Sequence, residues 1–512
     1  MMWINTKAKA TSLMRRAVAL VCATLLMLGL SVTAYADALT LQWQQDVTAS
    51  YAGDPQYGNA SSPIGWGYMD PMVVTIPSGP NAGQYALVFY SCTNSNGVPK
   101  SFYCVYLTKN GVVASDAMIM GQTALPSGLT GAEAYQPPML FFNSSTNTIY
   151  LAFWVLTTDG RSLVQLFSLV PPGSHWTAVS SYVGDVGNSF NYLGGAMDPK
   201  TGDIVIAGHG ERPNVRTLEV TKVTAASGYA TWAPSQIVTS YPTSPAAYWN
   251  PAYPHVAIRS DGIAPSTGGT LSILAVLANG APCVDPGKPG DGLITTSYKD
   301  VVNYEGKFGG AISGTWSDAA PDAGADGHGD SCYWASERFP LAHFSDGTSV
   351  YSIERATDLI SYDPNNKWGS NAMPNWNRRF KLYKDGAVIV ADLGSLFTSY
   401  FTYSSNIDAM SMTKLDNGNF VFFANNRGPA GYSLPITYPN FGVTWSKDLS
   451  TFAPAQYIAT LFGPGTSVKV AQPNSNGMTS VPFLDFFVSG NMYNASNVNT
   501  DHQFRYWRYT LQ

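Results

Sequence analysis

The sequence has few charged side chains: Asp, Glu, Lys and Arg together make up 12% of its 512 residues. The 28 Lys and Arg residues face 33 Asp and Glu residues, so the formal net charge is −5. Proteins that bind nucleic acid need a basic surface to neutralise phosphates. This composition gives no such electrostatic signal, and we expect no nucleic-acid partner.

Helix-period segments are almost absent after residue 37, and one long apolar run stands before it, at residues 17–30. Four basic residues precede that run, and the small-x-small triplet Ala34-Tyr35-Ala36 follows it. This order is typical of a cleaved secretion signal, and the run is short for a membrane span. We therefore predict a signal peptide at 1–36 and a secreted or periplasmic domain at 37–512, without a stable membrane anchor.

Cysteine is scarce as well. Cys22 falls inside the apolar leader, which leaves four cysteines and no Cys-x-x-Cys pair of the kind that binds zinc. Cys92 and Cys104 flank a polar turn, so they could face each other across a hairpin and leave Cys283 to pair with Cys332. Four cysteines allow three pairings, and this one is our prediction for an exported protein.

What the sequence has instead is one pattern, written about seven times: an apolar run of strand length, a tight polar turn and a second apolar run. The clearest copies turn at Asp346-Gly347 and at Asn417-Gly418. Others turn at Asn143, at 198–202 and at 261–262, and looser copies begin at Asp70-Pro71 and Val481-Pro482. Such turns favour β-hairpins, because Gly, Asn and Asp accept a positive φ.

The pattern recurs roughly every 55–85 residues, as the blade of a propeller does. We therefore predict an all-β protein, a single β-propeller of about seven blades. In a propeller the first strand of each blade lines the channel, and the antiparallel second strand returns to the face where the first began. Residues just before the first strand and just after the second should therefore meet on one rim, where ligands bind.

Several polar and aromatic residues occupy these rim positions, and four of them are arginines. The planar guanidinium group matches a carboxylate or sulfate in a bidentate pair, so the rim favours an acidic polysaccharide or oligosaccharide. The alternative is that the arginines form Arg–Glu pairs between neighbouring blades. The predicted substrate-binding residues are Arg212, Arg338, Arg355, Arg427 and Trp249.

One blade resembles a known family. Arg338-Phe339-Pro340, Asp346-Gly347 and Glu354-Arg355 resemble a blade of the BNR-type propellers, which include sialidases and ulvan-lyase-type polysaccharide lyases. The resemblance implies that Arg355 holds a uronate carboxylate. Phe339 stands where these lyases have a proton-donating tyrosine, and Tyr253-Pro254 stands where they have His-Pro. Ser446-Lys447-Asp448 begins like a sialidase Asp box but lacks its glycine.

Two chemistries fit such a rim. Elimination from a uronate, the first expectation, needs a carboxylate clamp, a base (His209 or His255) and an acid (Tyr192 or Tyr253).

Hydrolysis, the alternative, needs two carboxylates. Tyr68-Met69-Asp70-Pro71 resembles the entry to the first blade of five-bladed arabinanase-type glycosidases, which implies that Asp70 is a base. Glu337 or Glu211 would then be the acid. A third hypothesis is a non-catalytic, lectin-like propeller, since the fold alone does not imply a reaction.

No cofactor is required by these chemistries, and one loop suggests a structural ion. Asp322, Asp326 and Asp330 are spaced as in calcium loops, with Gly327 at the bend. Tyr333 stands where a bidentate glutamate would complete such a loop. The alternatives are a structural Ca²⁺ site and a solvated insertion.

Overall fold

The computed structural model describes residues 38–46, 73–92, 99–108, 111–119, 125–133, 138–173, 175–184, 189–242, 249–264, 267–284, 293–318, 336–361, 375–397, 407–426, 441–458, 467–470, 477–493 and 499–511. These ranges are β-strands and turns, with two short 3-10 helices, η3 (Ala225–Ser227) and η6 (Leu393–Phe397). The predicted all-β class is confirmed. No helix in these ranges is long and apolar enough to cross a membrane. Residues 1–37 lie outside them, so the signal peptide stays a prediction.

The strands form antiparallel sheets that follow one another along the chain. The first sheet contains β2 (Val73–Thr75), β3 (Tyr85–Cys92), β4 (Pro99–Thr108) and β5 (Gly111–Ile119). In the second, β6 (Gly131–Glu133) and β7 (Met139–Asn143) both pair with β8 (Thr148–Thr157), followed by β9 (Ser162–Leu169) and β10 (Thr177–Val183). The third contains β11 (Ser189–Met197), β12 (Ile204–Arg212), β13 (Val215–Val223) and β14 (Gln236–Pro242).

The next sheet has eight strands in two antiparallel halves, joined by a single parallel pair between Lys299 and Glu337. One half contains β15 (Trp249–Arg259), β16 (Thr270–Val284), β17 (Leu293–Gly306) and β18 (Ile312–Asp318). The other contains β19 (Ser336–Ser345), β20 (Val350–Ser361), β21 (Asn375–Lys384) and β22 (Ala387–Val390).

Two four-stranded sheets complete the described part of the chain. One contains β23 (Ile407–Lys414), β24 (Phe420–Asn426), β25 (Phe441–Ser446) and β26 (Gln456–Ile458). The other contains β27 (Ser467–Val470), β28 (Leu484–Tyr493), β29 (Asn499–Leu511) and, from the other end of the chain, β1 (Leu39–Asp46). Leu39 pairs with Leu511, so the last sheet is built from both ends of the described chain.

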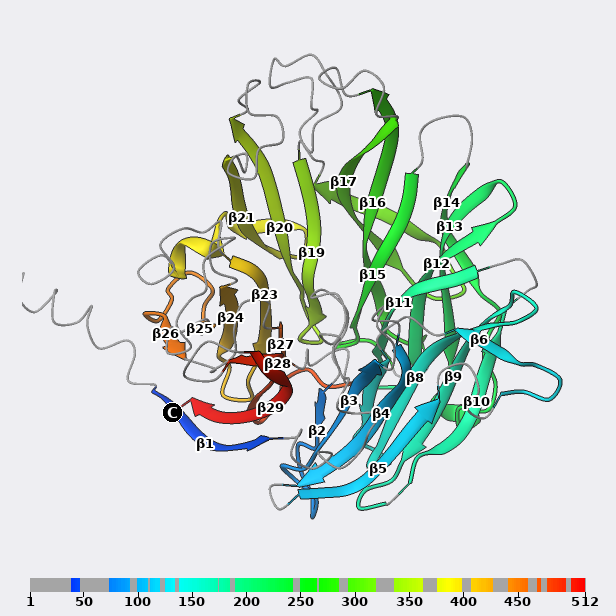
Figure 1. Cartoon of the computed structure of the whole chain (residues 1–512), viewed down its shortest axis with the longest axis horizontal. Coiled ribbons are helices and arrows are strands. Elements are labelled where there is room, and N and C mark those ends of the chain that lie inside the picture. Colours follow the sequence, from blue (N-terminus) through cyan, green and yellow to red (C-terminus); the bar gives the residue numbers. More distant parts are fainter. Residues whose placement is uncertain are drawn as a thin grey trace, which may run out of the picture.

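The sheets are arranged around a ring. Figure 1 shows them following one another in chain order, from the blue strands through green to red. Contacts between first strands run from β2 to β7 and on through β11, β15, β19, β23 and β27, and β28 then contacts β2. Radial sheets whose first strands meet around a centre are the architecture of a β-propeller.

The predicted hairpin turns lie where the sequence puts them. Gly202, Gly262, Gly347 and Gly418 all have a positive φ, between 72° and 94°, in the turns that follow β11, β15, β19 and β23. A residue with a β-carbon is strained in that conformation, which explains the Asp-Gly and Asn-Gly signals. Val481-Pro482 differs from the expectation. It leads into β28, the second strand of its sheet, because the first strand is β27.

The predicted disulfide between Cys92 and Cys104 is wrong. In the register of β3 and β4, Cys92 lies opposite Pro99, whereas Cys104 lies opposite Val88. The two cysteines are therefore offset by four strand residues, roughly 13 Å at about 3.3 Å per residue, and a disulfide needs Cα atoms within about 7 Å. Cys332 lies outside the described residues, and its pairing with Cys283 had depended on the first pair.

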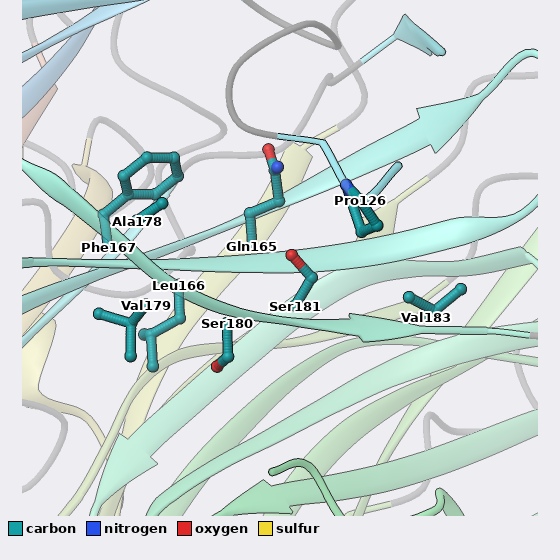
Figure 2. A pocket seen from close by; sticks show the side chains of 9 residues that line it. All are labelled: Pro126, Gln165, Leu166, Phe167, Ala178, Val179, Ser180, Ser181 and Val183. Atoms are coloured by element: carbon teal, nitrogen blue, oxygen red, sulfur yellow. The ribbon is translucent and has the colours of Figure 1, made fainter. Parts of the chain in front are cut away.

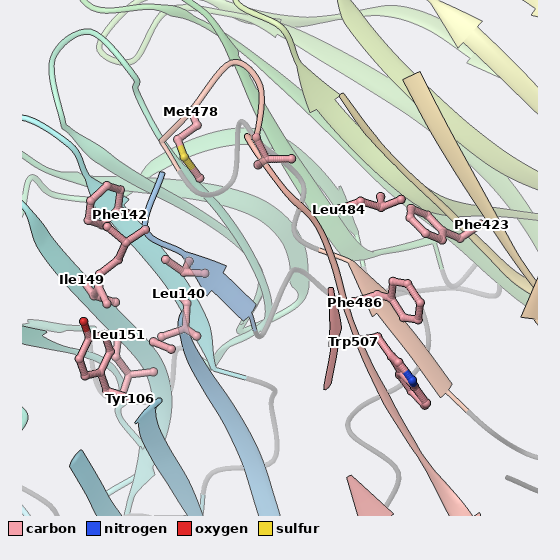
Figure 3. Close-up of a cluster of buried hydrophobic side chains, with 14 of the residues drawn as sticks. Tyr106, Leu140, Phe142, Ile149, Leu151, Phe423, Met478, Leu484, Phe486 and Trp507 are labelled. Carbon is pink, nitrogen blue, oxygen red and sulfur yellow. The ribbon is translucent and has the colours of Figure 1, made fainter. Parts of the chain in front are cut away.

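The largest apolar cluster joins sheets from the two ends of the chain. It contains Leu140 and Leu151 of the second sheet and Leu484, Phe486 and Trp507 of the last sheet, and Figure 3 shows these two groups of side chains. Because these side chains pack between sheets, burying them stabilises the ring as well as each sheet.

The hairpins between first and second strands are also tied to each other by hydrogen bonds. At Asp198, Oδ1 accepts the backbone N–H groups of Lys200 and Thr201 in its own turn, and Oδ2 accepts that of Gly269 in the next sheet, at 2.8 Å. Asp346 repeats this: Oδ1 accepts from Ser349 N, and Oδ2 from Lys414 Nζ at 2.7 Å. We call the face that carries these turns the hairpin face.

Two asparagines of the hairpin face use the same arrangement. Asn143 accepts from Ser145 N in its own turn and donates to the Tyr229 hydroxyl of the third sheet at 2.7 Å. Asn417 accepts from Asn419 N and donates to the Leu511 carbonyl of the last sheet at 3.2 Å. In each case one side-chain atom closes a turn and the other reaches the neighbouring sheet.

Candidate functional site

The edge opposite the hairpins contains the start of each first strand and the end of each second strand. Register shows this directly, since Ser189 pairs with Glu211, Trp249 with Asn279 and Ser336 with Asp358. We call this edge the mouth. Antiparallel pairing therefore brings strand ends from several sheets to one face, as the sequence predicts.

The predicted site residues divide into three groups. Asp70, Arg427, Asp322, Asp326 and Asp330 lie outside the described residues. For four more the backbone alone is described: Tyr192 in β11, Trp249 in β15, and Glu337 and Arg338 in β19. The side chains of the remaining residues are described, and they are His209, Glu211, Arg212, Tyr253, His255 and Arg355.

Three of these lie at the tip of the hairpin between β12 and β13. A two-residue turn, Pro213-Asn214, joins Arg212 to its partner Val215, and Asn214 has φ 65°. Before the turn, a β-carbon at Gly208 would stand 2.8 Å from side-chain atoms of Leu193 and Phe190. Packing at Gly208 therefore leaves no room for a side chain. This contact fixes the backbone path of the strand that leads to the tip.

Glu211 is the exposed carboxylate of this tip. Its side chain is 54% exposed, whereas that of His209, whose Nε2 lies 3.4 Å from Glu211 Oε1, is 1% exposed. The hydrogen bond from His209 lowers the pKa of Glu211, and the nearby charge of Arg216 adds to this effect. Glu211 is thus an ionised carboxylate that faces solvent at the mouth.

Arg212 is engaged within its own sheet. Its Nε and Nη2 atoms donate to the two oxygens of Glu219 on β13, at 2.8 and 2.9 Å, in a bidentate pair. The alternative expected from sequence, an Arg–Glu pair, is therefore present, but it joins two strands of one sheet and not two blades. Sequence reasoning missed Glu219. The available signal was its place on the strand that follows the Gly-His-Gly-Glu-Arg tip, only seven residues after Arg212.

Tyr192 and Tyr253 lie in irregular parts of first strands. The register of β11 shifts between Asn191 and Gly194, and that of β15 shifts between Ala252 and His255. Tyr253 has φ 52°, a strained value for a bulky residue, and its ring packs against the apolar cluster that contains Leu341 and Phe344. Such bulges redirect side chains, often beside active sites.

The other histidine and arginine of the prediction are less exposed. His255 is 2% exposed in β15. Arg355 is half-buried in β20 opposite Phe339, and the neighbouring Glu354 is fully buried. Both bases predicted for elimination, His209 and His255, are thus buried imidazoles, and Glu211 is the exposed group among the candidates with described side chains.

Comparison with known proteins yields no family and only distant structural matches. No family model matches the chain, and no curated protein matches it. Solved structures do match. An α-L-arabinofuranosidase from Fusarium graminearum matches at 11% identity and a TM-score of 0.38, covering 92% of this chain and 97% of that one. An α-L-arabinanase from Penicillium chrysogenum matches at 11% identity and 0.37, covering 92% and 98%.

A Synechocystis apocarotenoid oxygenase matches equally well, at 9% identity and a TM-score of 0.38, covering 89% of this chain and 98% of that chain. By its own ring of antiparallel sheets, the chain is a β-propeller. Its activity must be inferred from its own residues, because propellers carry out many reactions.

An open groove of this propeller lies apart from the predicted site residues. Within the described ranges, no group of three or more His, Cys, Asp and Glu side chains could hold a metal ion. An open groove of about 350 Å³ lies on β9 and β10, and Figure 2 shows Gln165, Phe167 and Ser181 lining it beside Pro126. None of the predicted site residues lines this groove.

Proposed function

We propose that this protein is a carbohydrate-active propeller that hydrolyses glycosidic bonds, and that Glu211 is one of its two catalytic carboxylates. The observation that carries the proposal is the Glu211 side chain: exposed at the mouth, held by the buried His209, and ionised. We also propose that each half of the eight-stranded sheet is a separate blade, which makes seven.

The lowered pKa of Glu211 supports one of the two carboxylate roles. In glycoside hydrolysis one carboxyl group donates a proton and needs a raised pKa, while the other acts ionised, as a base or nucleophile. Glu211 fits the second role and not the acid role first considered for it. The acid is then Glu337, whose backbone lies at the mouth in β19, with Asp70 as the other candidate.

Elimination has less support. A base for elimination must reach a ring proton of a polymer, and His209 and His255 are 1% and 2% exposed. Arg212, a predicted carboxylate clamp, is already paired with Glu219. An acidic sugar stays the first candidate ligand through Arg338, Arg355 and Arg427, and neutral polymers belong in the same test.

The test uses residues 37–512 with neutral polymers, including arabinan and arabinoxylan, and with uronate polymers, including polygalacturonate and ulvan. We expect new reducing ends without the ultraviolet absorbance of unsaturated ends. Replacing Glu211 by Gln should lower kcat about 10²–10⁴-fold. Asp159→Asn is the matched control, because Asp159 is an exposed carboxylate in the turn between β8 and β9 that pairs with Arg161.

The outcomes separate the hypotheses. Absorbance at unsaturated ends would show elimination, and equal activity of the Glu211→Gln and Asp159→Asn variants would remove Glu211 from the mechanism. Binding without any cleavage would indicate a lectin-like propeller.

We propose further that residues 1–36 direct export. Amino-terminal sequencing of the protein recovered from outside the cytoplasm should begin at Asp37, and retention of residues 1–36 would contradict the proposal. We also propose that the loop with Asp322, Asp326 and Asp330 binds a structural Ca²⁺. A higher melting temperature in calcium would support that site.

A further inference from the structure

Glu219 is a carboxylate buried behind the tip that carries Glu211. Its side chain is 1% exposed and accepts four hydrogen bonds, two from Arg212, one from Thr217 at 2.7 Å and one from Ser235 at 2.7 Å. Burial alone would raise the pKa of Glu219, but these bonds outweigh it and hold the pKa below its usual range. A buried ionised group with this many partners holds its surroundings in one arrangement.

The strand alternates between two faces at this point. His209 and Glu211 are two residues apart and share one face of β12, as their 3.4 Å approach shows. Gly210 and Arg212 belong to the other face, where Glu219 lies. A β-carbon at Gly210 would stand 2.6 Å from Glu219 Oε1, so the carboxylate occupies the space that a side chain would fill.

Glu219 therefore reaches Arg212 past Gly210 and ties the last residue of β12 to β13. The ion pair with Glu219 holds Arg212, one residue after Glu211, and close packing holds Gly208, three residues before Glu211. Glu211 is thus carried by a strand end that is held on both sides. Catalytic carboxylates need such support, because displacements of about 0.5 Å already reduce activity.

We propose that Glu219 is a positioning residue for Glu211, acting through Arg212 to hold the carboxylate beside His209 and toward the bound glycan. This inference rests on the proposed function of Glu211. It assigns Arg212 to the support of the site, and it predicts that Glu219 affects turnover without touching the substrate.

The test replaces Glu219 by Gln, which keeps the shape of the side chain and removes its charge. We expect kcat to fall about 10- to 100-fold with KM changed less than twofold, and the acidic limb of the kcat–pH profile to move to higher pH. The matched control is Asp203→Asn. Asp203 pairs with Lys222 at 3.1 Å in the same sheet, at its hairpin end, and its loss should leave both readouts unchanged.

A second measurement needs no substrate. The Glu211 side-chain carboxyl carbon is followed by NMR against pH, with the Glu211→Gln variant to assign its signal. Its pKa should lie below the usual range in the wild type. Removing the Glu219 charge would by itself lower this pKa, so a rise in Glu219→Gln, absent from Asp203→Asn, reports loss of the His209 bond. If the Glu219→Gln variant does not fold, Ser235→Ala removes one of the four bonds and should shift the same signal in the same direction.

Two results would overturn the proposal: an unchanged Glu211 titration in Glu219→Gln, or an equal shift in Asp203→Asn, which would indicate general loosening of the sheet. A wild-type protein that cleaves no glycan while the Glu211 signal still responds to Glu219→Gln would contradict the proposed function and leave the positioning intact.

Discussion

The turns of the hairpin face and the tip between β12 and β13 at the mouth are held in different ways. On the hairpin face, side chains such as Asp198 and Asp346 bond to their own turn and to the neighbouring sheet. At the mouth, the described tip between β12 and β13 is held from within its own sheet, by Glu219. The described hairpin turns therefore reach the neighbouring sheet, whereas this tip presents a carboxylate from a hairpin supported within one sheet.

This difference predicts whether a substitution changes the stability of the protein or its activity. A change on the hairpin face removes a bond between sheets and should lower the stability of the whole ring. A change at the tip that carries Glu211 should alter chemistry and leave the ring intact. The three predictions below test this division, from the largest expected loss of stability to the smallest.

The largest loss should follow from breaking the buried ion pair of the last sheet. Arg508 donates to both oxygens of Asp485 at 2.7 Å, and the Thr75 hydroxyl of β2 donates to Asp485 at 2.6 Å, so this cluster joins the last sheet to the first. Arg508→Met leaves Asp485 buried without its counter-charge and should cost about 3–5 kcal/mol in urea unfolding.

The double variant Arg508→Met/Asp485→Leu is the control, since it removes both charges and should recover much of the stability. A loss below about 1 kcal/mol in the single variant would contradict the role of this cluster in joining the two sheets.

A smaller, pH-dependent loss should come from His343. This imidazole is fully buried between β16 and β20, with Nδ1 2.8 Å from Ser352 Oγ and Nε2 3.1 Å from Ser272 O. Burial lowers the pKa of His343 to about 4. The unfolded chain then takes up the proton first, so this contribution is complete above about pH 6.5 and is lost as the pH falls toward 4, by about 3 kcal/mol.

Urea unfolding of the wild type and of His343→Asn between pH 7 and pH 4, compared at each pH, isolates this contribution from carboxyl groups that titrate in the same window. Parallel pH dependence of the two proteins would show that His343 accepts its proton while folded.

The smallest losses compare one chemical change on both faces. Asp198→Asn replaces an oxygen that accepts a backbone N–H by an amide group that cannot, so it should cost about 1–3 kcal/mol and leave kcat unchanged. Glu211→Gln changes an exposed group and should stay within about 0.5 kcal/mol while activity is lost. The opposite pattern would mean that chemistry resides on the hairpin face.

The hairpin turns were predictable from sequence, because Asp346-Gly347 and Asn417-Gly418 have a local conformational cause. The place of Glu211 at the mouth end of β12, and of the Glu337 backbone at the start of β19, follows from antiparallel pairing. The burial of each side chain could not be predicted from sequence in this way. His209 is as polar in sequence as Glu211, yet packing leaves one nearly inaccessible and the other exposed.

Long-range pairings were the part that sequence could not supply. The partner of Arg212 depends on the register of β12 and β13, and the mismatch of Cys92 and Cys104 depends on the register of β3 and β4. The pairing of β1 with β29 joins residues at opposite ends of the chain and has no local signal. Each needs the sheet to be known first.

Leu39 and Leu511 are neighbours in the last sheet, although they lie at opposite ends of the described chain. The order of the sheets along the chain can therefore be changed without changing which sheets contact one another. A short linker between these two ends, with a new opening in the turn after Met197, would give a circular permutant that retains the pairings described here. Such a molecule would offer new attachment points on the hairpin face, far from Glu211, for immobilising or fusing the protein.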